Sequence, residues 1–169
     1  MNIEEAIKTA LDYENKIMGV YVQYAEKFKS ETGRKIFETL GKEEEEHVNY
    51  LESKLEEWKK NGKVTPEALK TVVPDKDTIK KNVKGLKKVA KQESTDTEIE
   101  YFEKALEMEI QTSNFYKKLV QELPEGEKEL FEHFIAIEEG HEAIVSAEID
   151  NARGLGFWFD FQEFDLEAG

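Results

Sequence analysis

The sequence predicts an all-α fold, a four-helix bundle with a long crossover between its second and third helices. Two observations indicate this fold. Four long stretches repeat apolar residues at spacings of three and four, the period of one face of an α-helix. Residues 61–94, which differ in composition, separate the second stretch from the third. The 169 residues suffice for one domain with a hydrophobic core.

The first two helices are expected over about residues 3–28 and 34–60. Asn2 and Glu5 form a capping-box pattern at the start of the first helix. Gly62 follows the second helix, and glycine commonly ends a helix because it accepts the left-handed conformation. Their apolar stripes are Ile7, Leu11, Met18, Tyr21, Ala25 and Phe28 in the first helix, and Phe37, Leu40, Leu51, Leu55 and Trp58 in the second.

The third and fourth helices are expected over about residues 95–123 and 124–152. Thr95 and Glu98 form another capping-box pattern, and Pro124 suits the first turn of the last helix. Their apolar stripes are Phe102, Leu106, Tyr116 and Val120 in the third helix, and Leu130, Phe134, Val145 and Ile149 in the fourth. The bundle domain is therefore predicted to occupy residues 1–152.

The crossover predicts two short helices, one beginning at Thr65-Pro66-Glu67 and a second, amphipathic one. The apolar positions of the second are Ile79, Val83, Leu86 and Ala90. Residues 59–91 contain 11 lysines against three acidic residues, a net charge of +8 in a chain of −14. The tail, residues 153–169, is rich in aromatic side chains and is expected to pack on the bundle or on a partner subunit. We therefore favour a homodimer.

Composition excludes several classes of protein. A net charge of −14 argues against nucleic-acid binding, and no apolar run is long enough to span a bilayer. The absence of cysteine excludes disulfides, thiolate metal sites and cysteine nucleophiles. The first residues, MNIEEAIKTALDYE, lack the features of a signal peptide, so a cytoplasmic location is expected.

Six polar residues interrupt the apolar stripes of the four long helices. They are Glu14 in the first helix, Glu44 and His47 in the second, Glu109 in the third, and Glu138 and His141 in the fourth. Unpaired carboxylates inside a bundle are too costly to keep charged. No lysine or arginine lies on these stripes, so bound metal ions are the simplest source of positive charge.

The spacing of these residues supports a metal site. The Glu-x-x-His pairs Glu44/His47 and Glu138/His141 each place both side chains on one helix face. This arrangement, with a lone glutamate on each remaining helix, is typical of di-iron or di-manganese bundles. The chain also repeats itself: residues 10–21 match 105–116, and residues 37–47 match 131–141. Such a repeat predicts two equivalent half-sites at the bundle centre.

With these motifs the four long helices resemble the ferritin-like di-iron domain of the rubrerythrin family. The resemblance implies that the six residues are metal ligands for two irons. Manganese is an alternative because the donors are oxygen and nitrogen, and no residue beyond the ligands is predicted to be catalytic. It implies an oxidoreductase that reduces hydrogen peroxide or dioxygen. Two departures concern the activity. Thr112 stands where many rubrerythrins have a seventh carboxylate, and the chain lacks the four cysteines of a rubredoxin domain, so electrons must come from another protein.

Several alternatives remain at this stage. The chain is either an oxidoreductase, an iron-handling protein without peroxidase turnover, or a structural bundle with a vestigial site. Tyr21 and Tyr116 either hydrogen-bond the ligand carboxylates or only pack in the core. In the run from Glu43 to Glu46 only Glu44 has the register of the core, and His133 is expected near the surface.

The basic crossover also has two interpretations. It either docks an acidic electron donor such as a rubredoxin near a group of lysines, or forms a solvated helix against the acidic bundle. The lysines are Lys76, Lys80, Lys84 and Lys87. We favour the solvated helix.

Overall fold

The computed structural model describes residues 1–85 and 96–153, with the side chains of residues 82–85 excepted. The helices are α1 (Ile3–Ala25), α2 (Glu31–Asn61), α3 (Lys76–Gly85), α4 (Asp96–Glu122) and α5 (Glu125–Ala152). The described residues contain no β-strand, so the all-α prediction is confirmed. Of the aromatic tail only Arg153 is described, and residues 154–169 lie outside the described residues.

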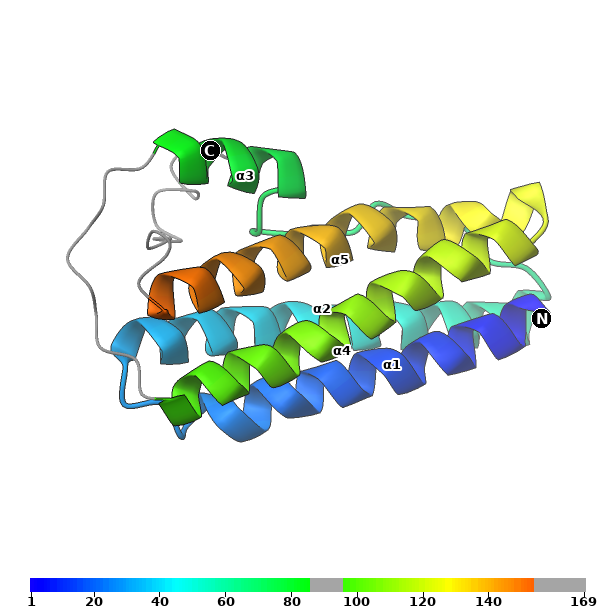
Figure 1. The fold of residues 1–169 in the computed structure, drawn as a ribbon. Helices are drawn as coiled ribbons and strands as arrows, with labels where there is room; N and C mark the ends of the chain where they lie inside the picture. Colours follow the sequence, from blue (N-terminus) through cyan, green and yellow to red (C-terminus); the bar gives the residue numbers. More distant parts are fainter. Residues whose placement is uncertain (86–95, 154–169) are drawn as a thin grey trace.

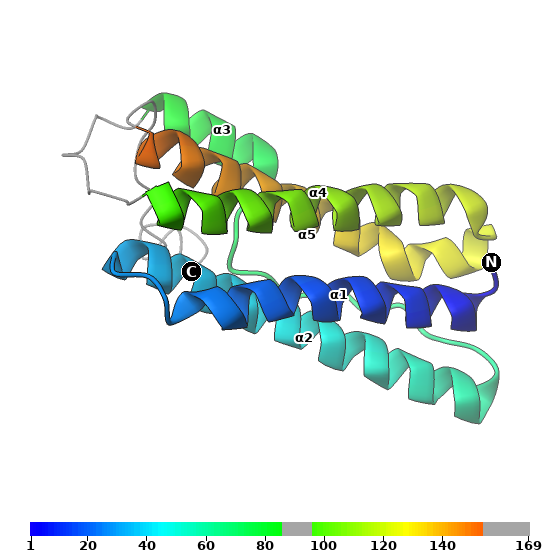
Figure 2. The same ribbon diagram turned by 60° about the horizontal axis from the view of Figure 1, so that its bottom comes forward.

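The four long helices lie side by side and form the bundle, and the short helix α3 lies over one end of α5 (Figures 1 and 2). Helix α1 packs against α2, and α4 packs against α5. Helix α2 ends at the end of the bundle where α1 begins, whereas α4 begins at the opposite end (Figure 1). The chain must therefore return along the whole bundle between α2 and α4, which confirms the predicted long crossover.

The helix ends follow from local chemistry. The Asn2 side chain accepts from the backbone N–H of Glu5 at 2.9 Å, and the Glu5 side chain accepts from Asn2 at 3.1 Å, so the predicted capping box is present. Helix α2 begins at Glu31, earlier than predicted, because the Ser30 hydroxyl caps it. It ends at Gly62, whose φ of 66° is the left-handed conformation that favours glycine.

Two apolar clusters fill the bundle, one toward each end. One contains Ile17, Phe37, Phe102 and Ile144, and the other contains Ile7, Leu51, Tyr116 and Phe134. Along every long helix the polar positions of the stripes fall between a residue of one cluster and a residue of the other. The four glutamates and two histidines therefore form a polar layer between two hydrophobic cores.

The predicted short helix at Thr65-Pro66-Glu67 is wrong. Residues 62–75 contain no helix and form an extended connection, here called the crossover strap. Its backbone bonds to the bundle: the Glu67 carbonyl accepts from the Tyr50 hydroxyl at 2.9 Å, and the Thr65 N–H donates to Glu57 at 2.8 Å. Backbone groups committed in this way are not free for the hydrogen bonds of a helix.

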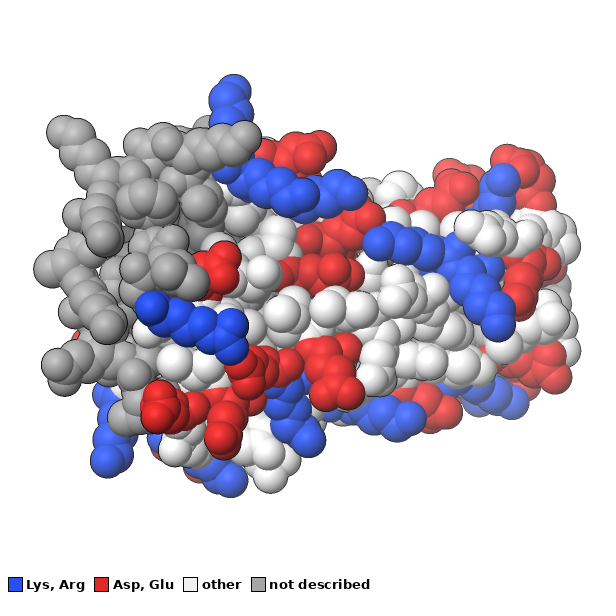
Figure 3. Space-filling view, viewed as in Figure 1, with Lys and Arg blue, Asp and Glu red and all other residues white. Residues whose placement is uncertain are grey.

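The second predicted crossover helix exists as α3, which buries Ile79 against α5. The side chain of Val83 and the residues Leu86 and Ala90 lie outside the described part. Figure 3 shows basic side chains (lysine and arginine) and acidic side chains (aspartate and glutamate) interspersed over the described part of this face. None of the described helices combines the length and the apolar character that a membrane span requires.

Candidate metal centre

The six polar residues of the stripes meet in the middle of the bundle. None of the six is more than 1% exposed. Helices α1 and α4 each supply one glutamate, and α2 and α5 each supply a Glu-x-x-His pair. Because the side chains at positions i and i+3 share one helix face, each pair enters the interior together. The six are Glu14, Glu44, His47, Glu109, Glu138 and His141.

The side chains form two overlapping groups that could each hold one metal ion. One group is Glu14, Glu44, His47 and Glu138, and the other is Glu44, Glu109, Glu138 and His141. Within each group the four candidate ligand atoms lie within 4.8 Å of one another. Both groups contain Glu44 and Glu138, so these two carboxylates can bridge a pair of ions. The sequence repeat exchanges one group for the other, as two equivalent half-sites require.

Both histidines turn Nδ1 toward the carboxylates. Nδ1 of His47 lies 3.0 Å from Glu44 and 3.3 Å from Glu14. Nδ1 of His141 lies 2.8 Å from Glu44 and 3.5 Å from Glu109. The two imidazole rings are nearly parallel, with centroids 5.8 Å apart. Each half-site thus has one nitrogen donor among carboxylate oxygens.

Two buried tyrosines bond to the cluster in a crossed pattern. The Tyr21 hydroxyl of α1 donates to Glu109 of α4, and the Tyr116 hydroxyl of α4 donates to Glu14 of α1. Both tyrosines are fully buried. Burial, with the neighbouring glutamates, raises the pKa of each hydroxyl well above its usual range. The hydroxyls therefore stay protonated and act as hydrogen-bond donors to the two carboxylates.

Burial and mutual repulsion perturb the acidic groups. Burial, with the Glu44 carboxylate nearby, raises the pKa of Glu14 to about 8. Burial and the neighbouring Glu14 and Glu44 raise the pKa of Glu138 well above its usual range. Burial opposes ionisation of Glu44 too, but the adjacent His47 and His141 hold its pKa below the usual range. In this environment the raised pKa values of Glu14 and Glu138 favour their protonated forms, and the lowered pKa of Glu44 favours its ionised form.

The donor set fits a pair of divalent cations. Oε2 of Glu109 and Oε2 of Glu138 are buried, and neither has a hydrogen-bond partner within residues 1–85 and 96–153. Among the described residues, no lysine or arginine pairs with any of the four glutamates of the cluster. Two divalent ions would supply the four positive charges that four carboxylates require. Oxygen and nitrogen donors without thiolate suit iron or manganese.

Glu43 was expected on the solvated face of α2, and that expectation is wrong. The residue is 5% exposed because the crossover strap covers it. Its carboxylate accepts from Nε2 of His141 at 2.7 Å and from the Val72 N–H at 2.6 Å. Burial alone would raise the pKa of Glu43, but these hydrogen bonds, with one from Thr71, lower it. No motif in the sequence distinguishes Glu43 from its exposed neighbours.

Other positions behave as their register indicates. Glu45 and Glu46 are exposed, and so is His133. Thr112, at the place of the seventh carboxylate, is fully buried. Its hydroxyl donates to the Met108 carbonyl of its own helix at 2.8 Å, so its hydrogen-bond donor is used within α4 and not on the cluster.

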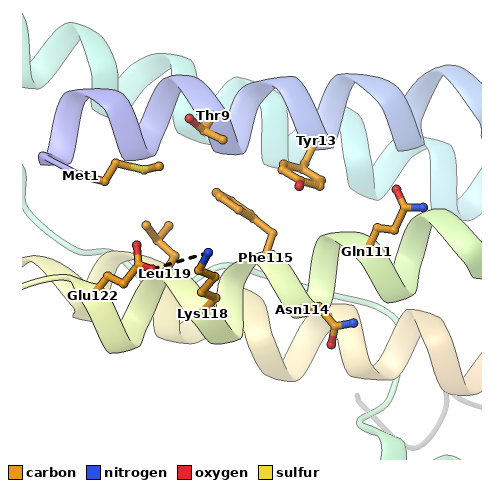
Figure 4. A pocket seen from close by; sticks show the side chains of 9 residues that line it. All are labelled: Met1, Thr9, Tyr13, Gln111, Asn114, Phe115, Lys118, Leu119 and Glu122. Atoms are coloured by element: carbon orange, nitrogen blue, oxygen red, sulfur yellow. Dashed lines mark ion pairs between the residues drawn. The ribbon is translucent and has the colours of Figure 1, made fainter.

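A surface groove between α1 and α4 lies apart from this centre (Figure 4). Tyr13 and Phe115 face each other across it, and their rings stack with centroids 4.4 Å apart. None of the six residues of the centre lines the groove. The groove therefore lies outside the candidate metal centre.

Comparison with known proteins agrees with this geometry. The family model described as Rubrerythrin matches residues 5–149. Neither the curated proteins nor the solved structures give a significant match. The matched range contains nearly all of the four long helices and all six residues of the cluster. The chain therefore belongs to the rubrerythrin family and is a ferritin-like protein with a domain of the di-iron type.

Proposed function

We propose that the six residues bind two irons, or manganese in their place, and that the protein reduces hydrogen peroxide or dioxygen. The observation that carries this proposal is the pair of matching donor groups sharing Glu44 and Glu138. Two metal ions held side by side with common ligands can act together on one small substrate. A separate protein is proposed as the source of electrons, and the 169 residues contain no cysteine that could form a rubredoxin centre.

The residues of this chain then have distinct tasks. A bound di-iron pair supplies the two electrons that, with two protons, convert hydrogen peroxide to two waters. Glu44 and Glu138 would hold both metal positions, and Glu14 and Glu109 would each complete one of them. Tyr21 and Tyr116 hold protons at their hydroxyls and orient these two carboxylates. The apolar clusters on both sides exclude bulk water.

The proposal is tested by replacing one ligand. Glu109→Ala is expected to abolish peroxide consumption by iron-loaded protein supplied with a chemical reductant, because it removes a carboxylate from one metal position. Glu107→Ala is the matched control, since Glu107 is exposed on the same helix. Peroxide turnover that survives in Glu109→Ala at the rate of the control would refute the catalytic proposal.

A second candidate function rests on Thr112. Its hydroxyl bonds within α4, so the chain lacks a seventh carboxylate at this position. An iron-handling protein that oxidises iron without peroxidase turnover would suit this difference. Anaerobic iron loading followed by peroxide and a chemical reductant distinguishes the two functions. Repeated turnover at two irons per chain favours the oxidoreductase, and accumulation of many irons per assembly favours iron handling.

Docking of an acidic electron donor on the lysines of the crossover is the alternative to the solvated helix that we favour. Lys80 is exposed on α3, which leaves it available to an acidic partner. Lys76 instead pairs with Glu139 of α5 at 3.0 Å, which favours the other interpretation, a basic helix lying on an acidic bundle. The side chain of Lys84 and the residue Lys87 lie outside the described part. If docking is electrostatic, added salt should slow the reduction of the metal-loaded protein by an acidic donor. Lys80→Glu should slow this reduction further.

The oligomer and the domain division are also proposals. We propose a homodimer in which residues 153–169 pack on the bundle or the partner subunit. Light scattering on the full chain and on a chain ending at residue 153 tests this. A dimer that becomes a monomer on truncation supports a role for the tail in the interface, and a monomeric full chain excludes the dimer.

A further inference from the structure

We propose that Glu43 is a positioning residue that orients His141 for metal binding, and that it makes the two metal positions unequal. On this proposal the position containing His141 binds metal more tightly than the position containing His47. The inference rests on the proposed ligand assignment, and it adds a residue outside the six and a difference between the half-sites.

The contacts of His141 identify the role of Glu43. Nδ1 of His141 lies 2.8 Å from Glu44, inside the cluster, and Nε2 lies 2.7 Å from Glu43 on the opposite side of the ring. Both neighbours are carboxylates, which only accept hydrogen bonds, so in the metal-free ring either nitrogen can carry the proton. With an ion in the cluster Nδ1 would be the metal donor, and Glu43 would then keep the ring proton on Nε2. The Nδ1 lone pair is then directed at the metal position. A carboxylate behind a histidine ligand fixes the ring and increases its basicity.

His47 has no equivalent support. Its Nε2 is buried and has no hydrogen-bond partner among the residues that the structure describes. The sequence repeat, at an offset of 94 in this region, relates Glu43 to Ile137, and an isoleucine cannot accept a proton. The two half-sites therefore share their ligands but differ in what stands behind the histidine.

The crossover strap holds Glu43 in place. The Thr71 hydroxyl donates to both carboxylate oxygens of Glu43, at 2.9 and 2.8 Å, and the Val72 N–H donates to Oε1 at 2.6 Å. The strap also touches α5 beside His141, because a Cβ at Gly140 would lie 2.7 Å from the Pro74 carbonyl oxygen. Glu43 thus links a connection outside the four-helix core to a ligand inside it.

The experiment measures Zn²⁺ binding by calorimetry, with metal analysis, on the metal-free full chain. Zinc is not redox-active, so the result is independent of any peroxidase activity. We expect the wild type to bind two Zn²⁺ in two resolved steps. Glu43→Gln should weaken the tighter step about 10- to 100-fold, the usual effect of removing such a partner, and change the weaker step far less. Glu45→Gln makes the same charge change at an exposed position of α2 and should leave both steps unchanged.

A second measurement needs no destabilised variant. In the Zn²⁺-loaded wild type, nitrogen NMR should show His141 protonated on Nε2, with a downfield, slowly exchanging proton, and His47 without that slow exchange.

Thr71→Val, which keeps Glu43, should weaken the tighter step less than Glu43→Gln does.

Three results would overturn the inference. If Glu43→Gln binds both Zn²⁺ as tightly as Glu45→Gln does, Glu43 serves packing alone, while the proposed ligand set stands. A fast-exchanging Nε2 proton on His141 would contradict the hydrogen bond itself. A wild type that binds no Zn²⁺ would remove this inference and the proposed function together.

Discussion

Gly140→Ala tests how closely the crossover strap packs against α5 beside the candidate metal centre. Gly140 lies in the middle of α5, directly before His141. A Cβ at this position would lie 2.7 Å from the Pro74 carbonyl oxygen and 3.7 Å from Val73. Ordinary van der Waals contact begins at 3.4 Å, so the Pro74 backbone would have to retreat by about 0.7 Å. A backbone carbonyl cannot turn away as the end of a flexible side chain can.

The matched control is Gly19→Ala. Gly19 is exposed in the middle of α1, and a Cβ there meets nothing within 4 Å. Both substitutions gain about 1 kcal/mol from the better helix propensity of alanine. At Gly140 overpacking costs about 1–3 kcal/mol, so the two variants should differ by that amount in free energy of unfolding. For a chain of this length the difference is roughly 2–12 °C in Tm.

Thermal unfolding of the metal-free proteins measures this difference. We expect Gly19→Ala to melt above the wild type and Gly140→Ala to melt below Gly19→Ala by the stated amount. Because Pro74 follows the strap residues that bond to Glu43, Gly140→Ala should also weaken Zn²⁺ binding. Equal gains in Tm for both variants, with unchanged Zn²⁺ affinity, would refute the close seating of the strap.

Three further predictions concern the buried polar groups. Tyr21→Phe and Tyr116→Phe should each lower the free energy of unfolding by about 1–3 kcal/mol, because each leaves a buried carboxylate without its donor; denaturant melts that match the wild type would contradict this. The folded-state pKa values of Glu14 and Glu138 are raised, so the metal-free protein should lose stability as pH rises from about 4.5 to about 8. Bound metal should abolish this loss, and parallel curves of Tm against pH with and without metal would contradict the prediction. Lys54→Met should increase the rate of proteolysis of the crossover strap, because Lys54 is 3% exposed and pairs with Glu57 of α2 and Glu67 of the strap. An unchanged cleavage rate would show that these ion pairs do not hold the strap on the bundle.

The long helices and the cluster were accessible from sequence because both depend on periodicity. A glutamate such as Glu14, seven residues from Ile7 and seven from Tyr21, must share their helix face, and the structure buries all three. The Glu-x-x-His pairs follow from the same geometry. The structure accordingly brings the six predicted residues together in one buried layer.

The crossover strap was not accessible in this way. Its conformation depends on distant side chains such as Tyr50, which bonds the backbone at Glu67, and no local pattern encodes that contact. Glu43 was missed for the same reason. Glu43 lies on α2 at the border of the core face. It is buried because the strap covers it, with Thr71, 28 residues further along the chain, bonding to its carboxylate. Long-range contacts overrode local register at both places.

The central claim is that six side chains from four helices hold two metal ions, and anomalous diffraction from crystals of the iron-loaded protein tests it most directly. We expect two anomalous peaks per chain, both lying between Glu44 and Glu138, one beside His47 and one beside His141. Anomalous density at the protein surface alone, or an iron-loaded crystal with no peak in the buried layer, would contradict it.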